Sequence, residues 1–270
     1  MKKVRGKTVL ITGGASGIGL CTACEFAKAG SRLILTDIDE QKLAEAERVI
    51  RDLGAEVTTY VNDVRDRKAV EKLARDVLER FGNLDILINN AGVGLTKELK
   101  DTTMDEWKKL IDINLWGPLY FIYAFLPSML EKHSGHIVNI SSGQAFFRLP
   151  TWGAYAAIKL CLSAISEVLY FEMAPHKIKV TAVHPFMVNT GFYDTAAPET
   201  FGGKLSMKLL PFYSSTPDKV GKIIFNAVRK EKMFEMAHIF NTFGYYSKFS
   251  DVVNKGMGHM TTWFLAKHEK

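Results

Sequence analysis

Two side chains four residues apart, Tyr155 and Lys159, combine a phenol with an ammonium group. On a helix this spacing places both side chains on one face. A neighbouring ammonium stabilises the phenolate and lowers the pKa of the tyrosine, which would let it move a proton near neutral pH. The pair alone is a weak indication, because most such pairs lie on helix surfaces. Upstream, Ser141 and Ser142 follow an apolar run and offer hydroxyls to a carbonyl or alcohol oxygen.

A glycine-rich segment, Thr12–Gly19, follows an apolar run and precedes a helical pattern. Its glycines allow a tight turn and let a pyrophosphate approach the backbone. The start of the helix adds free N–H groups and a partial positive charge. Turns also use glycine, so the prediction depends on the strand before the segment and the helix after it. We expect a dinucleotide site whose contacts here are Gly13, Ser16, Gly17, Ile18 and Gly19.

Asp37 ends the second apolar run of the chain. A carboxylate at this place accepts hydrogen bonds from the hydroxyls of the adenosine ribose and repels a 2′-phosphate. No Lys or Arg replaces Ser16 in the glycine-rich segment to attract such a phosphate. Asp37, with Ile38 beside it, therefore favours NAD over NADP as the cofactor. The alternative is a solvated acidic residue at the end of a strand.

These residues need a scaffold, and the first 185 residues alternate short apolar runs with longer helical patterns, such as Glu40–Leu53 and Asp66–Phe81. The runs are continuously apolar, as expected for parallel strands covered on both faces. We predict an α/β fold, a doubly wound Rossmann-type parallel sheet of about seven strands with helices on both faces. The strand candidates are Thr8–Thr12, Arg32–Thr36, Glu56–Val61, Leu84–Asn89, His136–Ile140 and Lys179–His184.

The segment Leu115–Leu130 is almost entirely apolar. A membrane span normally needs about 20 apolar residues, and this segment is interrupted by Pro118 and Pro127. A helix that is apolar on all sides is otherwise buried in a core or an interface. Because the segment falls where the alternation requires a helix, we predict a buried helix.

The composition is that of a globular protein: 270 residues, 47% hydrophobic and 24% charged. This apolar content excludes global disorder. Residues 201–270 carry 11 Lys and Arg against 5 Asp and Glu, together with 12 of the 30 aromatic residues. Such a tail indicates either a solvated face around a packed subdomain or a surface for a membrane or for an acidic or apolar ligand. Nucleic-acid binding has no support beyond the net charge of +6, which is confined to this tail.

Three cysteines, Cys21, Cys24 and Cys161, fit a reducing compartment. No second pair of Cys or His accompanies Cys21 and Cys24 at the spacing that a zinc site would need. We therefore expect no metal site, and we expect both residues to be small buried hydrophobic side chains on a helix.

Together these motifs resemble the short-chain dehydrogenase/reductase family, in its single-domain branch, over residues 5 to about 195. The resemblance is loosely nearest the hydroxysteroid and retinol dehydrogenase subgroups. In this family the serine lies 13 residues before the tyrosine, which selects Ser142 over Ser141. The matching positions are Thr12–Gly19, Asp63 for the adenine pocket, Asn89–Gly92, Asn114, Ser142, Tyr155, Lys159, Pro185 and Thr190.

The resemblance implies a catalytic role for four residues. Tyr155 would be the general acid/base, and Lys159 would lower its pKa and bind the nicotinamide ribose. Ser142 would orient the reacting oxygen, and Asn114 would support a water that links Lys159 to solvent. The implied cofactor contacts are Gly13, Ser16, Gly17, Ile18, Gly19, Asp37, Ile38, Asp63, Val64, Asn90, Ala91, Gly92, Tyr155, Lys159, Pro185, Val188 and Thr190.

One departure from the family pattern is Phe186, which stands after Pro185 where the family usually has glycine. The cofactor loop could therefore follow another path, or Phe186 could form a wall of the substrate site. Aromatic residues surround this position, which fits a lipophilic secondary alcohol of steroid, retinoid or long-chain type. Alternatively these residues pack the lid onto itself. The expected substrate contacts are Ser142, Gln144, Trp152, Tyr155, Phe186 and Phe192.

We thus expect one domain over residues 1–270, with a cofactor-binding and catalytic core in 5–195 and a substrate lid and basic aromatic extension in 196–270. The expected activity is NAD-dependent interconversion of an alcohol and a ketone in the cytoplasm. Membrane association through the tail stays open. A 3-oxoacyl or general carbonyl reductase is the alternative, and a non-catalytic NAD-binding regulatory protein a remote one. The resemblance also implies a homodimer or homotetramer joined through the helices in Asn114–Leu130 and Tyr155–Phe171.

Overall fold

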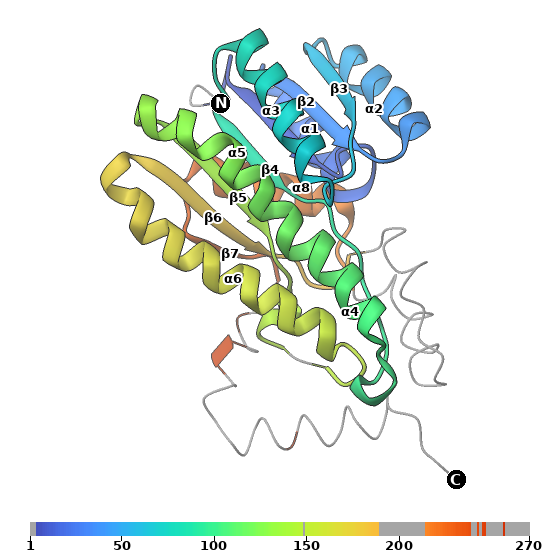
Figure 1. Ribbon diagram of the computed structural model, residues 1–270. Coiled ribbons are helices and arrows are strands. Elements are labelled where there is room, and N and C mark those ends of the chain that lie inside the picture. The colour runs from blue at the N-terminus through green and yellow to red at the C-terminus, as the bar shows by residue number, and fades with distance from the viewer. Residues whose placement is uncertain are drawn as a thin grey trace.

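A single sheet of seven parallel strands runs through the computed structural model, which describes residues 4–147, 149–188, 214–238, 242, 245, 246 and 256 (Figure 1). The strand order is β3-β2-β1-β4-β5-β6-β7. The direction of winding reverses between β1 and β4, and such a point opens a crevice at the carboxyl ends of the strands. The strands are β1 (Thr8–Thr12), β2 (Arg32–Asp37), β3 (Val57–Val61), β4 (Ile86–Asn89), β5 (Gly135–Ile140), β6 (Ile178–His184) and β7 (Phe234–Met236).

Helices cover both faces of the sheet, which confirms the predicted doubly wound fold. Helices α1, α2 and α8 pack on one face, and α3, α5 and α6 on the other. The helices are α1 (Gly17–Lys28), α2 (Glu40–Asp52), α3 (Arg67–Phe81), α4 (Met104–Ile111), α5 (Gly117–Lys132), α6 (Gly153–Met173) and α8 (Pro217–Arg229). Shorter turns are η1 (Leu99–Asp101), η2 (Asp112–Trp116), η3 (Gly143–Ala145) and η4 (Ala174–His176).

Local signals in the sequence set the helix ends. The Asp39 carboxylate accepts a hydrogen bond from the first turn of α2, and Asp66 does the same for α3. Gly82 ends α3 in the left-handed conformation at φ 72°, which glycine adopts without strain. These ends fix how each helix returns to the next strand.

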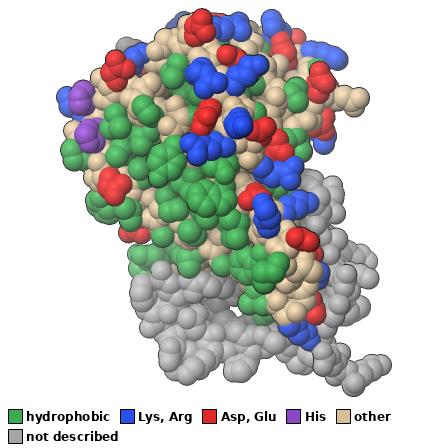
Figure 2. Space-filling model, in the orientation of Figure 1, with side chains coloured by type: hydrophobic (Ala, Val, Ile, Leu, Met, Phe, Trp, Pro, Cys, Tyr) green, Lys and Arg blue, Asp and Glu red, His purple; other side chains and the backbone are tan. Residues whose placement is uncertain are grey.

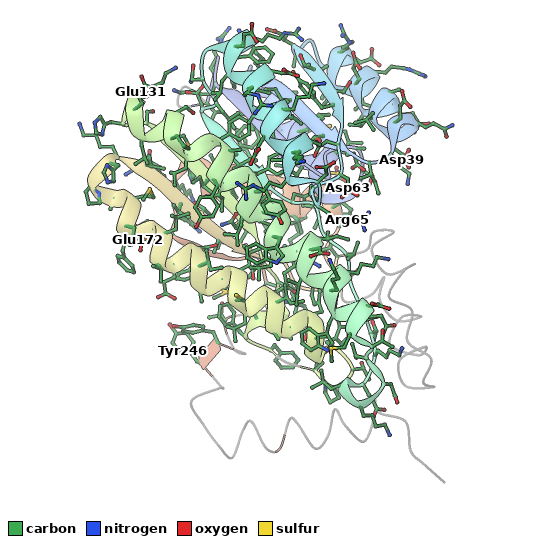
Figure 3. The ribbon with its side chains drawn as sticks, in the orientation of Figure 1. Asp39, Asp63, Arg65, Glu131, Glu172 and Tyr246 are labelled. Atoms are coloured by element: carbon green, nitrogen blue, oxygen red, sulfur yellow. The ribbon has the colours of Figure 1, made fainter. Side chains whose placement is uncertain are left out.

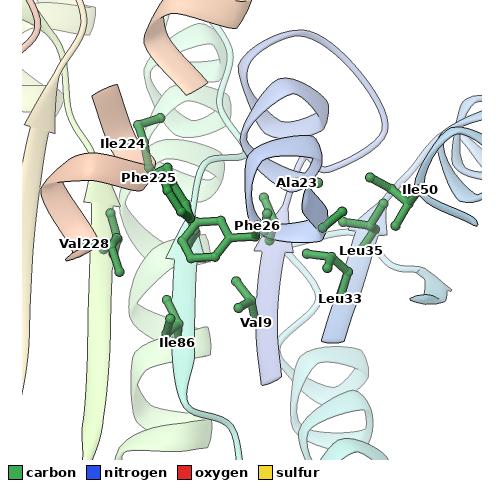
Figure 4. Packing of buried hydrophobic residues seen from close by; sticks show 14 of the residues in the cluster. Val9, Ala23, Phe26, Leu33, Leu35, Ile50, Ile86, Ile224, Phe225 and Val228 are labelled. Carbon is green, nitrogen blue, oxygen red and sulfur yellow. The ribbon is translucent and has the colours of Figure 1, made fainter. Parts of the chain in front are cut away.

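The core on the α1 side joins the first and last parts of the chain. Phe26 of α1 and Phe225 of α8 meet edge to face with ring centroids 5.1 Å apart, above Val9 and Ile86 of the sheet (Figure 4). At Gly221 of α8, an added Cβ would lie 2.8 Å from the backbone of α1. Helix α8 and strand β7 therefore complete the sheet, although they lie in the segment expected to form the lid and extension.

The apolar segment Leu115–Leu130 forms the end of η2 and most of α5, but it is not buried on all sides as predicted. Tyr123 is 70% exposed and Trp116 45%. With Val168 and Phe171 of α6 they belong to an apolar patch over α5 and α6 (Figure 2). Composition alone cannot separate a helix buried in a core from one that presents an apolar face to solvent or to a partner.

Two helical stretches within the described residues, Met104–Lys132 and Gly153–His176, are long and apolar enough to cross a membrane. Core helices of globular proteins pass the same test. Both stretches include helices that pack on the sheet, α5 and α6.

Two of the three cysteines differ from the expectation of buried side chains. Cys21 and Cys24 are only half-buried and Cys161 is exposed. Partial burial, with Asp218 as a hydrogen-bond partner, raises the pKa of Cys21 to about 12, so its thiol is unreactive at neutral pH. Within the described part of the chain, no group of three or more His, Cys, Asp or Glu side chains is placed to hold a metal ion.

Candidate active site

The glycine-rich segment connects β1 to α1 and packs so closely on its neighbours that no larger residue fits at Gly13 or Gly19. An added Cβ at Gly13 would lie 2.9 Å from the Ala91 Cα, and one at Gly19 would lie 2.0 Å from the Gly13 carbonyl oxygen. Ser16 stands before the first turn of α1 and makes no capping hydrogen bond through its side chain. The N–H groups of that turn are therefore not occupied by the Ser16 hydroxyl and fit a pyrophosphate.

A second loop holds this segment in place. Asn90, directly after β4, donates through Nδ2 to the carbonyl oxygens of Thr12 and Gly13, both at 3.0 Å. The Thr12 hydroxyl accepts from the backbone N–H groups of Asn90 and Ala91, also at 3.0 Å. The predicted contacts from both loops thus lie together at the carboxyl ends of β1 and β4, where the winding of the sheet reverses.

Asp37 lies at the end of β2, beside the glycine-rich segment. Its carboxylate accepts from the backbone N–H of Ala15 at 3.3 Å and from that of Ile38 at 2.8 Å. The Ile38 side chain is 68% exposed. A fixed negative charge next to the loop fits ribose hydroxyls and opposes a further phosphate.

The predicted adenine-pocket residue Asp63 lies two residues after the neighbouring strand β3 and has a partner that was not predicted. Arg65 donates to both carboxylate oxygens, with Nη2 2.6 Å from Oδ2 (Figure 3). Arg65 holds the pKa of this carboxyl below its usual range. Val64 between them is buried against the start of α5, where a Cβ on Gly117 would lie 3.0 Å from it. The short Asp-x-Arg spacing was the only available signal.

Tyr155 and Lys159 lie in the first two turns of α6, with 6% and 4% of their surfaces exposed. Ser142 follows β5, and its hydroxyl is hydrogen-bonded to Tyr155. The Lys159 Nζ lies 5.8 Å from the centre of the Tyr155 ring and donates to the Ile140 carbonyl oxygen at 2.9 Å. The structure therefore brings the three predicted catalytic groups together at the carboxyl edge of the sheet.

The acidity of Tyr155 differs from the prediction. Burial raises the pKa of its phenol to about 12, and the hydrogen bond with Ser142 offsets only part of this. Burial also lowers the pKa of Lys159 to about 8. The four-residue spacing brings the Lys159 ammonium within one turn of the phenol, but the ammonium donates to a strand carbonyl oxygen. Desolvation therefore determines the pKa of the phenol. The phenol is the resting form of Tyr155 at neutral pH.

Asn114 lies inside the π-turn η2 and is fully buried. Its Oδ1 accepts from the Val93 N–H at 3.2 Å, and its Nδ2 donates to the carbonyl oxygens of Val93 and Leu110, both at 3.1 Å. An added Cβ on Gly92 would lie 2.7 Å from the same Oδ1. Asn114 thus fixes the loop that carries Gly92; its expected support of a water stays a prediction.

The loop after β6 carries the departure from the family pattern. Pro185 accepts a hydrogen bond from the Gly143 N–H at 2.7 Å, which ties this loop to the one that follows Ser142. Met187, rather than Phe186, adopts a positive φ of 39°. Val188 is buried and bridges to Ser215. Thr190 and Phe192 lie outside the described residues, as does most of the basic aromatic tail.

Two of the remaining predicted substrate residues, Trp152 and Gln144, contact Tyr155 and Ser142. Trp152 is buried, with its ring 5.5 Å from that of Tyr155. Gln144 is 5% exposed, and its Oε1 accepts from the Leu149 N–H at 3.2 Å. Phe186 is half-buried and stacks on His238 at 5.4 Å. His238 was not predicted from the sequence, because its position depends on where β7 joins the sheet.

Comparison with known proteins agrees with this geometry. The sequence profile of the short chain dehydrogenase family matches residues 7–200. An uncharacterized oxidoreductase of Staphylococcus saprophyticus is 38% identical over 191 residues, which cover 70% of this chain and 82% of that protein. Estradiol 17-beta-dehydrogenase 11 of Pongo abelii is 38% identical over 194 residues, covering 71% of this chain and 65% of that protein.

Solved structures show the same architecture. A short chain dehydrogenase/reductase from Burkholderia phymatum, solved in complex with NAD, has a TM-score of 0.86 at 27% identity and covers 94% of this chain and 97% of its own. An NAD+-bound xylitol dehydrogenase has a TM-score of 0.79 at 26% identity, covering 87% of this chain and 98% of its own. The chain belongs to the short chain dehydrogenase family and is an NAD(P)-dependent oxidoreductase.

Proposed function

We propose that this protein uses NAD to interconvert a lipophilic secondary alcohol and its ketone, with Tyr155 as the acid/base. The observation that carries the proposal is the hydrogen bond between Ser142 and Tyr155 at the same sheet edge as the glycine-rich segment. A proton-transfer group and a dinucleotide cradle at one edge are what a hydride-transfer reaction requires.

The protein groups handle the proton. The Ser142 Oγ accepts from the Gln144 N–H at 3.2 Å and shares a hydrogen bond with Tyr155; a substrate oxygen lying between the two hydroxyls would take over that bond. In ketone reduction the Tyr155 phenol gives its proton to the carbonyl oxygen, and in alcohol oxidation the phenolate removes the hydroxyl proton. A bound nicotinamide ring would supply or accept the hydride.

Lys159 would act through its charge and its remaining N–H donors. As an ammonium it has three donors, one of which binds the Ile140 carbonyl oxygen. The other two suit ribose hydroxyls, and the positive charge favours the phenolate of Tyr155. The rest of the cofactor would be held by Gly13, Ser16, Gly17, Ile18, Gly19, Asp63, Val64, Asn90, Ala91, Gly92, Pro185, Val188 and Thr190.

The choice of NAD rests on Asp37, whose carboxylate lies against the Ala15 N–H of the glycine-rich segment. We expect Asp37→Ala to lower the ratio of kcat/KM with NAD to kcat/KM with NADP by at least about tenfold, because the repulsion of the 2′-phosphate is removed. Initial rates with both cofactors measure this ratio. An unchanged preference would remove Asp37 from its role.

The lipophilic substrate class rests on the rings around the site. Phe147 contacts Phe186 edge to face at 6.1 Å, and Phe186 stacks on His238. All three side chains are half-buried. A polyol would need several buried polar partners, whereas aromatic rings favour hydrocarbon. The similarity to an estradiol dehydrogenase agrees with this choice.

A panel of estradiol, 2-decanol and xylitol, each tested with NAD and NADP, checks the proposal. We expect turnover of estradiol or 2-decanol with NAD, and kcat/KM for xylitol lower by at least about a hundredfold. Efficient oxidation of xylitol without turnover of either lipophilic alcohol would refute the substrate class. Absence of turnover in both directions, despite NADH binding, would favour the non-catalytic alternative.

We also propose that the apolar patch over α5 and α6 joins two copies of the chain. Exposed apolar patches of this kind mark interaction surfaces, and Tyr123 and Phe171 are its most exposed members on the two helices. Light scattering should give a dimer or tetramer that Tyr123→Glu dissociates. A monomeric wild-type protein would contradict this.

A further inference from the structure

A buried histidine that the proposed function does not use ends strand β6. His184 is fully buried, and its Nε2 lies 3.0 Å from the Ser163 hydroxyl of α6. Burial lowers the pKa of the imidazole to about 3, so the ring is neutral at physiological pH. A buried polar side chain kept in a core normally has a structural or functional reason.

His184 connects several elements around the active site. Its ring centroid lies 4.7 Å from that of Phe146, which follows η3, and 5.7 Å from that of Phe234 in β7. Its carbonyl oxygen accepts from the Ala237 N–H at 3.2 Å. The next residue is Pro185, which is tied to the loop after Ser142. The imidazole therefore bridges β6, β7, α6 and the serine loop.

Ser163 lies one helical turn beyond Lys159, on the same side of α6. That part of α6 is fixed to β5 by two hydrogen bonds. The Ser141 hydroxyl donates to the Lys159 carbonyl oxygen at 2.7 Å, and the Lys159 Nζ donates to Ile140. The contact between Ser163 and His184 fixes the next turn to β6. Two adjacent strands thus determine the rotation of α6 about its axis.

We infer that His184 is a positioning residue for the reaction. Through Ser163 it sets the rotation of α6 and hence the distance between the Tyr155 phenol and Ser142. The inference rests on the proposed function, because it assigns the effect to catalysis by Tyr155. A displacement of about 1 Å at a reacting group can reduce a rate by about a hundredfold.

The chain contains a matched control for this residue. His136 in β5 is 6% exposed, and its Nε2 lies 2.8 Å from the Thr181 hydroxyl of β6. Burial lowers the pKa of this imidazole to about 4. His136 lies near the amino end of its strand, away from the carboxyl edge where Tyr155 and Ser142 meet. Its loss should reduce stability without altering catalysis.

The experiment compares His184→Gln, His184→Asn and His136→Asn, with kcat for the best alcohol of the panel and Kd for NADH as readouts. A Gln amide reaches about as far as Nε2 of histidine, whereas an Asn amide reaches only the place of Nδ1. We expect His184→Asn to lower kcat at least about tenfold with Kd for NADH changed less than about twofold. His184→Gln and His136→Asn should keep kcat within about threefold of wild type.

Other results would overturn the inference. The inference fails if kcat of His184→Asn stays within about threefold of wild type. It also fails if His184→Gln loses as much activity as His184→Asn, or if His136→Asn does. A Tyr155→Phe variant measured alongside separates the two claims. If Tyr155→Phe keeps its activity, the proposed function fails; if it is inactive while His184→Asn is normal, only the positioning role fails.

A second pair of variants covers the case in which His184→Asn does not fold. Ser163→Ala removes the partner hydroxyl, and Ser128→Ala removes a half-buried hydroxyl of α5 that bonds to the Phe125 carbonyl oxygen of its own helix. We expect kcat to fall at least about threefold in Ser163→Ala and to stay within about twofold in Ser128→Ala. Equal values in the two variants would overturn the inference.

Discussion

Replacing Gly19 by alanine tests the glycine-rich segment as a cofactor cradle. The added Cβ would lie 2.0 Å from the Gly13 carbonyl oxygen and 2.7 Å from the Asn90 Nδ2, while real Cβ atoms essentially never approach closer than 3.0 Å. The carbonyl oxygen must therefore move by about 1 Å or more, since it is backbone and has no alternative rotamer. The movement falls on the turn proposed to hold the pyrophosphate.

The expected magnitude follows from this overlap. Overpacking of this kind costs about 1–3 kcal/mol. About 2 kcal/mol of lost binding free energy corresponds to a roughly thirtyfold weaker affinity. We therefore expect Gly19→Ala to raise the Kd for NADH by about thirtyfold and to lower Tm by several degrees.

Gly54→Ala is the matched control. Gly54 lies just after α2 rather than within a helix and has a φ of +77°, and an added Cβ there would meet nothing within 4 Å. It should cost about 1–2 kcal/mol in stability from its backbone conformation and leave the affinity for NADH unchanged. Fluorescence titration with NADH and thermal unfolding give both quantities. If Gly19→Ala binds NADH as tightly as Gly54→Ala does, the cradle is wrongly assigned.

Two further predictions concern pH. Because burial raises the pKa of Tyr155 to about 12, kcat/KM for alcohol oxidation should rise with pH. The kcat/KM for ketone reduction should stay level near neutral pH, where the phenol keeps its proton. An oxidation rate that is independent of pH would contradict the assignment. Stability should fall on acidification, because the unfolded chain takes up a proton on each histidine near pH 6.5 whereas folded His136 resists protonation down to about 4. Between these pH values His136 alone should lower the free energy of unfolding by about 3 kcal/mol. The Tm of His136→Asn should therefore fall less steeply with pH than that of the wild type, and an equally steep fall would contradict this.

The elements of the sheet were predictable because parallel strands are buried on both faces. Each apolar run, from Thr8–Thr12 to Lys179–His184, lies on an observed strand, with ends that differ by two residues or fewer. Strand β7 is only three residues long and has half-buried side chains, so it leaves no such run. Helix α5 was predicted as a helix but not with its exposed face, because apolar composition does not say what covers a surface.

The site was predictable in its membership but not in its electrostatics. Spacing and order brought Ser142, Tyr155 and Lys159 together, and the structure places them in contact or within one helical turn. The raised pKa of Tyr155 could not be read from spacing, because it depends on how deeply α6 is buried. The partner of His184 was equally hidden, since it depends on the register between α6 and β6.

The central claim is that Tyr155 transfers the proton in a hydride-transfer reaction. The most direct measurement is kcat for Tyr155→Phe with NAD and the best alcohol of the panel, together with its Kd for NADH. We expect a loss of kcat of at least about a thousandfold, with Kd for NADH changed less than about threefold. A variant that keeps kcat within about tenfold of wild type would contradict it.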